Sequence, residues 1–185
     1  DAQGAVRGFD CGPGNVLMDA WVQQHLGASY DEDGRWAAGG QVQAALLAQC
    51  LAEPYFALPA PKSTGRDLFH LSWLQQQLAA LLPLKMATQD VQATLLELTA
   101  RSIAEALQRE APQPPAQLLV CGGGAYNGAL MARLQALLPA VAVQSSAAYG
   151  LAPNQVEAAA FAWLAAQCLQ GRALPLPSVT GAAAG

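Results

Sequence analysis

The chain has 185 residues, of which 53% are hydrophobic and 12% charged, so it is expected to fold around its own core and not to be disordered. A net charge of −4 and nine scattered lysines and arginines argue against nucleic-acid binding. There is no secretory signal, no run of about 18 apolar residues, and no cysteine spacing typical of a metal site or a disulfide framework, so we expect reduced cysteines and a cytoplasmic protein.

The order of apolar runs, glycines and prolines predicts an α/β fold in which helices outnumber strands. The first half is predicted to hold a strand at 5–9, a helix between the cap Asn15 and Gly27, a polar turn-rich segment at 29–40, a helix at 41–52, an extended loop at 54–66 and a helix at 71–82. The second half is predicted to hold a long helix at 90–110 capped by Asp90, a buried strand at 117–121, a helix at 127–138, a strand at 141–144, a helix at 154–169 and a fraying tail at 175–185.

Two glycine-rich turns, at residues 8–15 (G-F-D-C-G-P-G-N) and 120–125 (V-C-G-G-G-A), each follow a short apolar run and lead into a helix. Backbone N–H groups and a helix N-terminus that meet at one point suit an anion such as a phosphate. Gly12 and Gly14 would let the backbone approach a ligand, or would simply form a tight turn. Three consecutive glycines, Gly122, Gly123 and Gly124, indicate a flat nucleotide ring or ribose against the main chain, or a close strand–helix crossing.

Asp10 is the candidate catalytic residue of the first turn. A carboxylate repels a phosphate beside it, unless it binds a metal or takes a proton from an attacking hydroxyl or water. The functional interpretation is therefore a general base in phosphoryl transfer. The alternative is that Asp10 caps its own turn through its side chain.

Other polar residues are weaker candidates. The cluster at 62–66 (K-S-T-G-R) could touch a phosphate or carboxylate, but it does not match a G-x-x-x-x-G-K-S/T loop and could equally cap the next helix. Glu157 lies in the first turn of the last helix, where it could interact with the helix dipole or bind a sugar hydroxyl. His25 and His70 are isolated and are interpreted as surface or core-edge residues.

Six runs together resemble, in the same order, the C-terminal half of anhydro-N-acetylmuramic acid kinase, a family of the sugar kinase/Hsp70/actin superfamily. They are GFDCGPGN (8–15), APKSTGR (60–66), DVQATL (90–95), LLVCGGGA (118–125), EA with AFAWL (157–158 and 160–164) and LPSVTG (176–181). The resemblance implies a ribonuclease-H-like, actin-like ATPase lobe at 1–174, with a central mixed sheet flanked by helices, and a C-terminal tail at 175–185. The N-terminal lobe of the family would be absent from this chain.

The resemblance also implies a reaction that depends on ATP and Mg²⁺. In this reaction, water opens the 1,6-anhydro ring of anhydro-N-acetylmuramate while O6 is phosphorylated, which gives N-acetylmuramate 6-phosphate in bacterial peptidoglycan recycling. Asp10 corresponds to the base that activates the water. Gly12 and Gly14 match a phosphate-binding turn, Gly122, Gly123 and Gly124 match the adenosine loop, and Glu157 and Asn127 are expected substrate contacts. No metal ligand is assigned to this chain.

Two departures from the family pattern stand out. Cys11 replaces a threonine, and a thiol is the weaker hydrogen-bond donor. The family's G-T-S-x-D-G loop, which binds the first phosphates and the metal, is missing, and the chain begins at Asp1 as if in mid-protein.

The missing half affects what we expect of the chain by itself. The isolated lobe is expected to have little or no activity, and an exposed sheet edge or lobe interface would favour self-association as a homodimer. Two alternatives remain at this point, a non-catalytic nucleotide-binding module of the same fold and a related sugar- or acetate-type kinase lobe.

Overall fold

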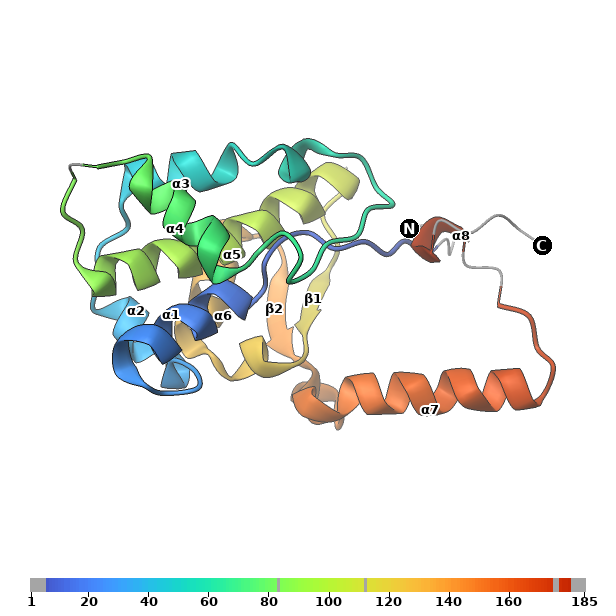
Figure 1. Cartoon of the computed structure of the whole chain (residues 1–185). Helices are drawn as coiled ribbons and strands as arrows, with labels where there is room; N and C mark the ends of the chain where they lie inside the picture. The colour runs from blue at the N-terminus through green and yellow to red at the C-terminus, as the bar shows by residue number, and fades with distance from the viewer. Residues whose placement is uncertain (1–5, 83, 112, 175–176, 181–185) are drawn as a thin grey trace.

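The computed structural model describes residues 6–82, 84–111, 113–174 and 177–180. Figure 1 shows helices gathered around a long helix, α5, with a two-stranded sheet beside them and helix α7 projecting from the rest of the chain. The helices are α1 (Val16–Leu26), α2 (Arg35–Ala38), α3 (Ala44–Leu51), α4 (Leu71–Ala79), α5 (Thr88–Glu110), α6 (Gly128–Leu137), α7 (Val156–Leu169) and α8 (Pro177–Thr180). The 3₁₀ turns are η1 (Glu32–Gly34), η2 (Pro54–Ala57), η3 (Gly123–Tyr126), η4 (Ser146–Tyr149) and η5 (Pro153–Gln155), and the strands are β1 (Gln117–Val120) and β2 (Ala142–Ser145).

Helix α5 is the centre of the core, and α1, α2, α3 and α6 pack around it. Ten consecutive residues, 91–100, are buried, so this part of the helix is covered on all sides and not only on the apolar face that its sequence predicts. Several of its buried polar side chains form hydrogen bonds, although Gln92 Oε1 has no partner among the described residues. Thr99 Oγ1 donates to the carbonyl of Gly14, and Thr94 Oγ1 donates to the carbonyl of Asp90.

Asp90 does not cap α5, contrary to the prediction. The helix begins at Thr88 after Ala87, so Asp90 already lies in its first turn. Its carboxylate instead accepts hydrogen bonds from the amide of Gln41 and from Gln43 Nε2. These contacts hold the segment before α3 against α5, and α3 starts only at Ala44, later than predicted.

The sheet is smaller than predicted. Strands β1 and β2 pair in parallel, with Gln117 opposite Ala142 and Val120 opposite Ser145, and they form a two-stranded sheet in the described part of the chain in place of the expected mixed sheet. Strand β1 alternates between exposed and half-buried residues, so the prediction of a buried strand is wrong. The alternation follows from the pleat, which turns every second side chain away from the covering helices.

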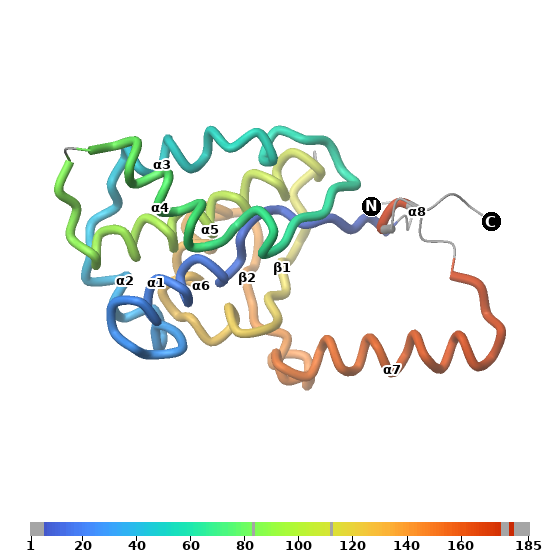
Figure 2. The backbone as a smooth tube through the Cα atoms, in the orientation of Figure 1, coloured from blue at the N-terminus to red at the C-terminus, as the bar shows by residue number. Residues whose placement is uncertain are grey.

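The segment 6–9 is extended but is not a strand, which also corrects the sequence prediction. Its backbone hydrogen bonds go to other partners: Gly8 N donates to the carbonyl of Ser178, and Ser178 Oγ donates to the carbonyl of Val6. Ser178 belongs to α8, which lies beside the start of the chain in Figure 2. The tail expected to fray therefore contains one short helix, while 175–176 and 181–185 lie outside the described residues.

Helix α7 has an apolar sequence but no buried residue. Its large side chains are open to solvent, with Phe161 65% exposed, Trp163 52% and Leu169 90%. A helix that is apolar around its whole circumference is normally buried, so α7 has the composition of an interior helix without the surroundings of one. None of the helices in the described residues is both long and apolar enough to cross a bilayer.

Candidate functional site

The first glycine turn is fixed to the central helix. A Cβ added at Gly12 would lie 2.7 Å from Ser102 Oγ and 2.9 Å from its Cβ, so α5 leaves no room for a side chain there. Gly14 has a φ of +55° and opens to free space, and its carbonyl accepts a 2.8 Å hydrogen bond from Thr99 Oγ1. Close packing thus explains why position 12 holds a glycine, whereas the left-handed backbone conformation explains the glycine at position 14.

Asp10 stands at the start of this turn with an exposed side chain. Its Oδ2 accepts hydrogen bonds from Ser63 Oγ at 2.8 Å and from the Thr64 amide at 2.9 Å. Its amide donates to the carbonyl of Lys62 at 3.0 Å, and its carbonyl accepts a 2.6 Å bond from the Tyr55 hydroxyl. The carboxylate is therefore oriented by residues more than 50 positions away in the sequence, and not by its own turn.

Lys62 secures the loop that holds Asp10. Its Nζ donates to the carbonyls of Tyr55 at 2.9 Å and Phe56 at 3.2 Å, and lies 4.6 Å from the centre of the Tyr55 ring. Burial, together with the nearby cation of Arg109, lowers the pKa of Lys62. The Lys62 side chain is thus bound to η2 and is not presented to a ligand. The polar cluster does not cap α4 either, because His70 Nδ1 accepts the hydrogen bond from the Trp73 amide there.

Burial also keeps two neighbouring groups protonated at neutral pH. It raises the pKa of Tyr55 to about 12, with the negative charge of Asp10 adding to the effect. It likewise raises the pKa of the Cys11 thiol. Tyr55 therefore remains a hydroxyl donor to the Asp10 backbone, and burial favours the thiol form of Cys11 over the thiolate.

The second glycine turn meets the first one in space. Gly122 has a φ of +71°, and its amide donates to the carbonyl of Pro153 at 2.9 Å. A Cβ at Gly123 would lie 3.3 Å from Asn15 Nδ2, and one at Gly124 would lie 3.5 Å from Asn15 Oδ1. The N-terminal position of Asn15 on α1 is as predicted, but its side chain makes no cap hydrogen bond and lies at the junction of the two turns.

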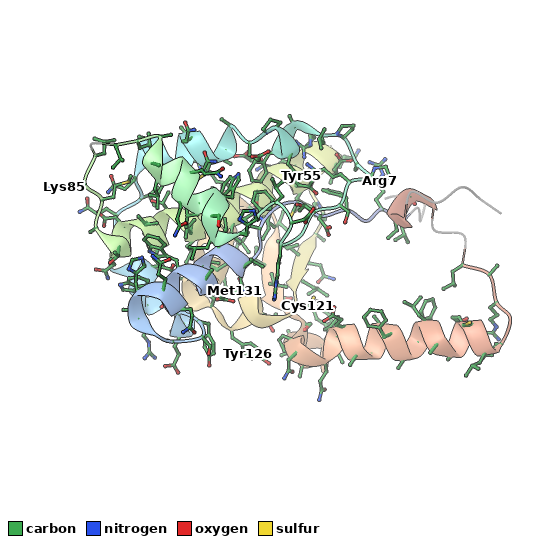
Figure 3. The ribbon with its side chains drawn as sticks, viewed as in Figure 1. Arg7, Tyr55, Lys85, Cys121, Tyr126 and Met131 are labelled. Carbon is green, nitrogen blue, oxygen red and sulfur yellow. The ribbon has the colours of Figure 1, made fainter. Side chains whose placement is uncertain are left out.

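A cavity of about 520 Å³ opens at this junction. Its lining includes Asn15, Gly123, Tyr126 and Asn127. Figure 3 labels Tyr126 and Cys121, which both lie in the loop that joins β1 to α6. The volume is in the range of small-ligand sites. One residue of each glycine turn, Asn15 and Gly123, lines this cavity.

The charge of the cavity decides which part of a nucleotide would fit. Its lining contains the carboxylates of Asp19, Asp31, Glu32 and Asp33 against the single guanidinium of Arg35. Burial raises the pKa of Asp19. An acidic lining repels a polyphosphate, whereas carboxylates can accept hydrogen bonds from hydroxyl groups such as those of a ribose. Both oxygens of Asp31 already accept hydrogen bonds from the amides of Trp36 and Ala37.

The described residues contain no group of three or more histidine, cysteine, aspartate or glutamate side chains arranged to hold a metal ion. A Mg²⁺ ion carried by a nucleotide takes most of its ligands from phosphates and water and needs one or two protein carboxylates. The residues of this chain are compatible with such an ion, but they do not form a dedicated metal site in the part that the structure describes.

Two predicted substrate contacts do not join Asp10. Asn127 caps α6, since its Oδ1 accepts from the Leu130 amide at 3.0 Å, and it borders the cavity beside Gly123. Glu157 is exposed in the first turn of α7, the helix that projects from the rest of the chain (Figure 1). The structure therefore gathers Asn127 and the glycine turns around one cavity and leaves Glu157 apart from them.

Comparison with known proteins confirms the family resemblance that the sequence indicated. The family model described as anhydro-N-acetylmuramic acid kinase matches residues 2–185. The chain belongs to this kinase family. Three curated proteins named anhydro-N-acetylmuramic acid kinase illustrate the similarity. The one from Pseudomonas putida is 60% identical over 177 residues, which are 96% of this chain and 48% of the relative.

The relatives from Xanthomonas axonopodis pv. citri and Cupriavidus pinatubonensis are 58% and 55% identical, each over 180 residues. These alignments cover 97% of this chain and 47% and 48% of the two relatives. The chain thus spans about half the length of the curated relatives of this family that it matches.

Sequence reasoning missed the roles of Asn15, Tyr55, Ser63 and Thr64. The K-S-T-G-R run signalled a polar loop, but only the fold brings it to Asp10. Asn15 was assigned to a helix cap because asparagine favours that position, yet its side chain serves the contact between the two turns. Tyr55 gave no local signal, since a buried tyrosine is also an ordinary core residue.

Proposed function

We propose that this chain forms the C-terminal lobe of an ATP-dependent kinase that opens the 1,6-anhydro ring of anhydro-N-acetylmuramate and phosphorylates its O6. The observation that carries the proposal is the continuous path from the oriented carboxylate of Asp10, along the Gly12–Gly14 turn, to Asn15 and the cavity at Gly123. Membership of the kinase family supports the same reaction. We place it in bacterial peptidoglycan recycling in the cytoplasm.

In the proposed reaction, Asp10 accepts a proton from water as the water oxygen bonds to C1 of the sugar. The C1–O6 bond breaks and its electron pair stays on O6, which bonds to the transferred phosphorus while ADP leaves. Water, anhydro sugar and ATP thus give the 6-phosphate, ADP and one proton. A positioned base of this kind contributes about 10²- to 10⁴-fold to a rate.

The chain would hold the nucleoside at the acidic cavity, which Gly123, Tyr126 and Asn127 line, with Gly122 and Gly124 next to Gly123 in the turn. Bound ATP with its Mg²⁺ supplies the phosphoryl group. The Gly12–Gly14 turn would hold the phosphates by backbone N–H groups, because it leads from the cavity towards Asp10. Asn127 then contacts nucleotide and not sugar, since it shares the cavity with Gly123.

The proposed lobe, residues 1–174, has the ribonuclease-H-like fold of actin-like ATPases, and its partner is the other half of the family's sequence. Helix α7 supports the need for a partner, because Phe161, Trp163 and Leu169 are exposed. Docking of the second lobe would cover them and would bring Glu157 towards the sugar. The isolated chain is accordingly expected to be inactive, with exposed apolar surface that favours homodimers.

The test joins this chain to the remaining half of the Pseudomonas putida relative and measures ADP release with ATP, Mg²⁺ and anhydro-N-acetylmuramate. The joined protein should turn over, the chain alone should not, and Asp10→Asn in the joined protein should lose about 10²- to 10⁴-fold of kcat. Glu32→Gln, an exposed cavity carboxylate, controls for loss of charge and should alter mainly the KM for ATP.

Four outcomes would contradict the proposal in different ways. Turnover by the isolated chain would refute the requirement for a second lobe. Near-normal turnover of Asp10→Asn would remove Asp10 as the base. Nucleotide binding with no turnover in the joined protein would favour a non-catalytic nucleotide-binding module, and turnover with another sugar alone would favour a related sugar kinase.

A further inference from the structure

The loop at residues 60–64 meets Asp10 through more contacts than an exposed carboxylate needs. The Ser63 hydroxyl and the Thr64 amide both donate to Oδ2, at 2.8 and 2.9 Å. The carbonyl of Lys62, one residue earlier, accepts from the amide of Asp10 at 3.0 Å. Three successive residues of one loop therefore contact one residue of the glycine turn.

The loop itself is attached to a rigid support. Lys62 Nζ bonds to two carbonyls of η2, and the Tyr55 hydroxyl of η2 donates to the Asp10 carbonyl at 2.6 Å. Tyr55 is buried and packs edge-to-face on Phe69, which packs edge-to-face on Trp73. Loop and glycine turn are thus bound to the same aromatic cluster and cannot shift independently.

We propose that Ser63 is a positioning residue for the reaction, which with the Thr64 amide holds Oδ2 of Asp10 so that Oδ1 is directed to the attacking water. Within the described residues, both hydrogen bonds to this carboxylate fall on Oδ2. A solvated aspartate samples several rotamers, whereas two donors on one oxygen select a single orientation. Orientation matters because a base acts only within hydrogen-bond reach of the proton that it abstracts.

This inference rests on the proposed role of Asp10 as the base, so its test has one arm that needs no activity. In the 185-residue chain, amide hydrogen exchange of Thr64 is measured by NMR in the wild type and in Asp10→Ala. Loss of the acceptor should speed exchange of the Thr64 amide by about tenfold. An unchanged exchange rate would show that the hydrogen bond from the Thr64 amide to Asp10 does not form in solution, and it would overturn the proposal.

The second arm uses the joined two-lobe protein and separates positioning from folding. Ser63→Ala should lower kcat by about 10- to 100-fold while each KM stays within about twofold, because binding surfaces are unchanged. Ser63→Thr keeps the hydroxyl and should recover most of kcat. Ser72→Ala, at an exposed serine on α4, is the matched control and should behave as wild type.

The outcomes distinguish this inference from the proposed function. Normal kcat in Ser63→Ala, alongside an inactive Asp10→Asn, would overturn the positioning role and leave Asp10 as the base. Full turnover in Asp10→Asn would overturn the proposed function. Amide exchange of Thr64 would still report whether its hydrogen bond to Asp10 forms. A loss of kcat in Ser63→Ala that Ser63→Thr does not recover would also count against positioning by the hydroxyl.

Discussion

Replacement of Glu97 by glutamine probes the ion pair that joins the central helix to the helix behind the second glycine turn. Glu97 lies on α5 and is only 5% exposed. Its Oε2 accepts from Arg133 Nε at 2.5 Å, and its Oε1 accepts from Arg133 Nη2 and Arg101 Nε, each at 2.8 Å. Arg133 belongs to α6, so the pair ties α6 to α5.

The expected loss of stability depends on the burial of Glu97 and on the exposure of its two arginine partners. Removing one partner of a fully buried pair costs about 3–5 kcal/mol, because the other charge stays unpaired. Here the side chains of Arg133 and Arg101 are 37% and 40% exposed, so water can solvate both after the substitution. Glu97→Gln is therefore expected to destabilise the chain by about 2 kcal/mol, or about 4–8 °C in Tm.

The loss should depend on pH in a defined direction. Hydrogen bonding from Arg133 lowers the pKa of Glu97 below its ordinary value of 4.5, although burial opposes the shift. A carboxylate whose pKa is lowered by folding stabilises the folded state fully above its unfolded pKa and ceases to do so as the pH falls through the folded pKa. The difference between wild type and Glu97→Gln should thus be largest at neutral pH and shrink below about pH 4.

Urea denaturation followed by circular dichroism, at about pH 7 and about pH 3, measures both quantities. Glu105→Gln, at an exposed glutamate of the same helix, is the control and should change stability by less than about 0.5 kcal/mol at either pH. The reasoning would be refuted if Glu97→Gln were equally harmless at neutral pH. It would also be refuted if the loss persisted undiminished in acid.

Three further predictions concern packing. Gly34→Ala should lower the free energy of unfolding by about 1–3 kcal/mol, because Gly34 has a φ of +67° and the new Cβ would lie 2.7 Å from that of Ala129. Thermal melts measure this loss, and a Tm equal to that of the wild type would contradict it. Gly12→Ala should lower the free energy of unfolding by a similar amount, because its new Cβ clashes with Ser102. Recovery of stability in the double variant with Ser102→Gly would confirm that cause. Trp163→Ser should reduce self-association of the isolated chain in light scattering, and a wild type that stays monomeric at high concentration would refute the expected association.

Much of the local structure could be predicted because it depends on short-range patterns. The helix after Asn15 ends at Gly27 in the left-handed conformation, and the apolar spacing locates α5 and α6 to within a few residues. Asp90 shows where this reasoning stops. Its position suited a cap, but its carboxylate binds the segment before α3 instead, some 49 positions away. Local propensity says nothing about partners at that distance.

The candidate site divides in the same way. The glycine turns and the carboxylate of Asp10 were identified from the sequence because their composition is unusual and their backbone demands are local. Their grouping with Ser63, Thr64 and Asn15 was not, because it depends on how η2, α5 and the second turn pack. Glu157 lies exposed in the first turn of α7, as the sequence indicated, and its assignment as a substrate contact stays a prediction.

The sequence alone determined the order of helices, the two glycine turns, the family and the identity of Asp10 as the candidate base, since each is written in contiguous residues. Only the tertiary structure decided that residues 91–100 of α5 are buried all round, that Gly12 is a glycine because of Ser102, and that the K-S-T run orients Asp10. The physical reason is range: backbone propensity acts over a few residues, whereas burial and side-chain hydrogen bonds join segments that meet only when the chain folds.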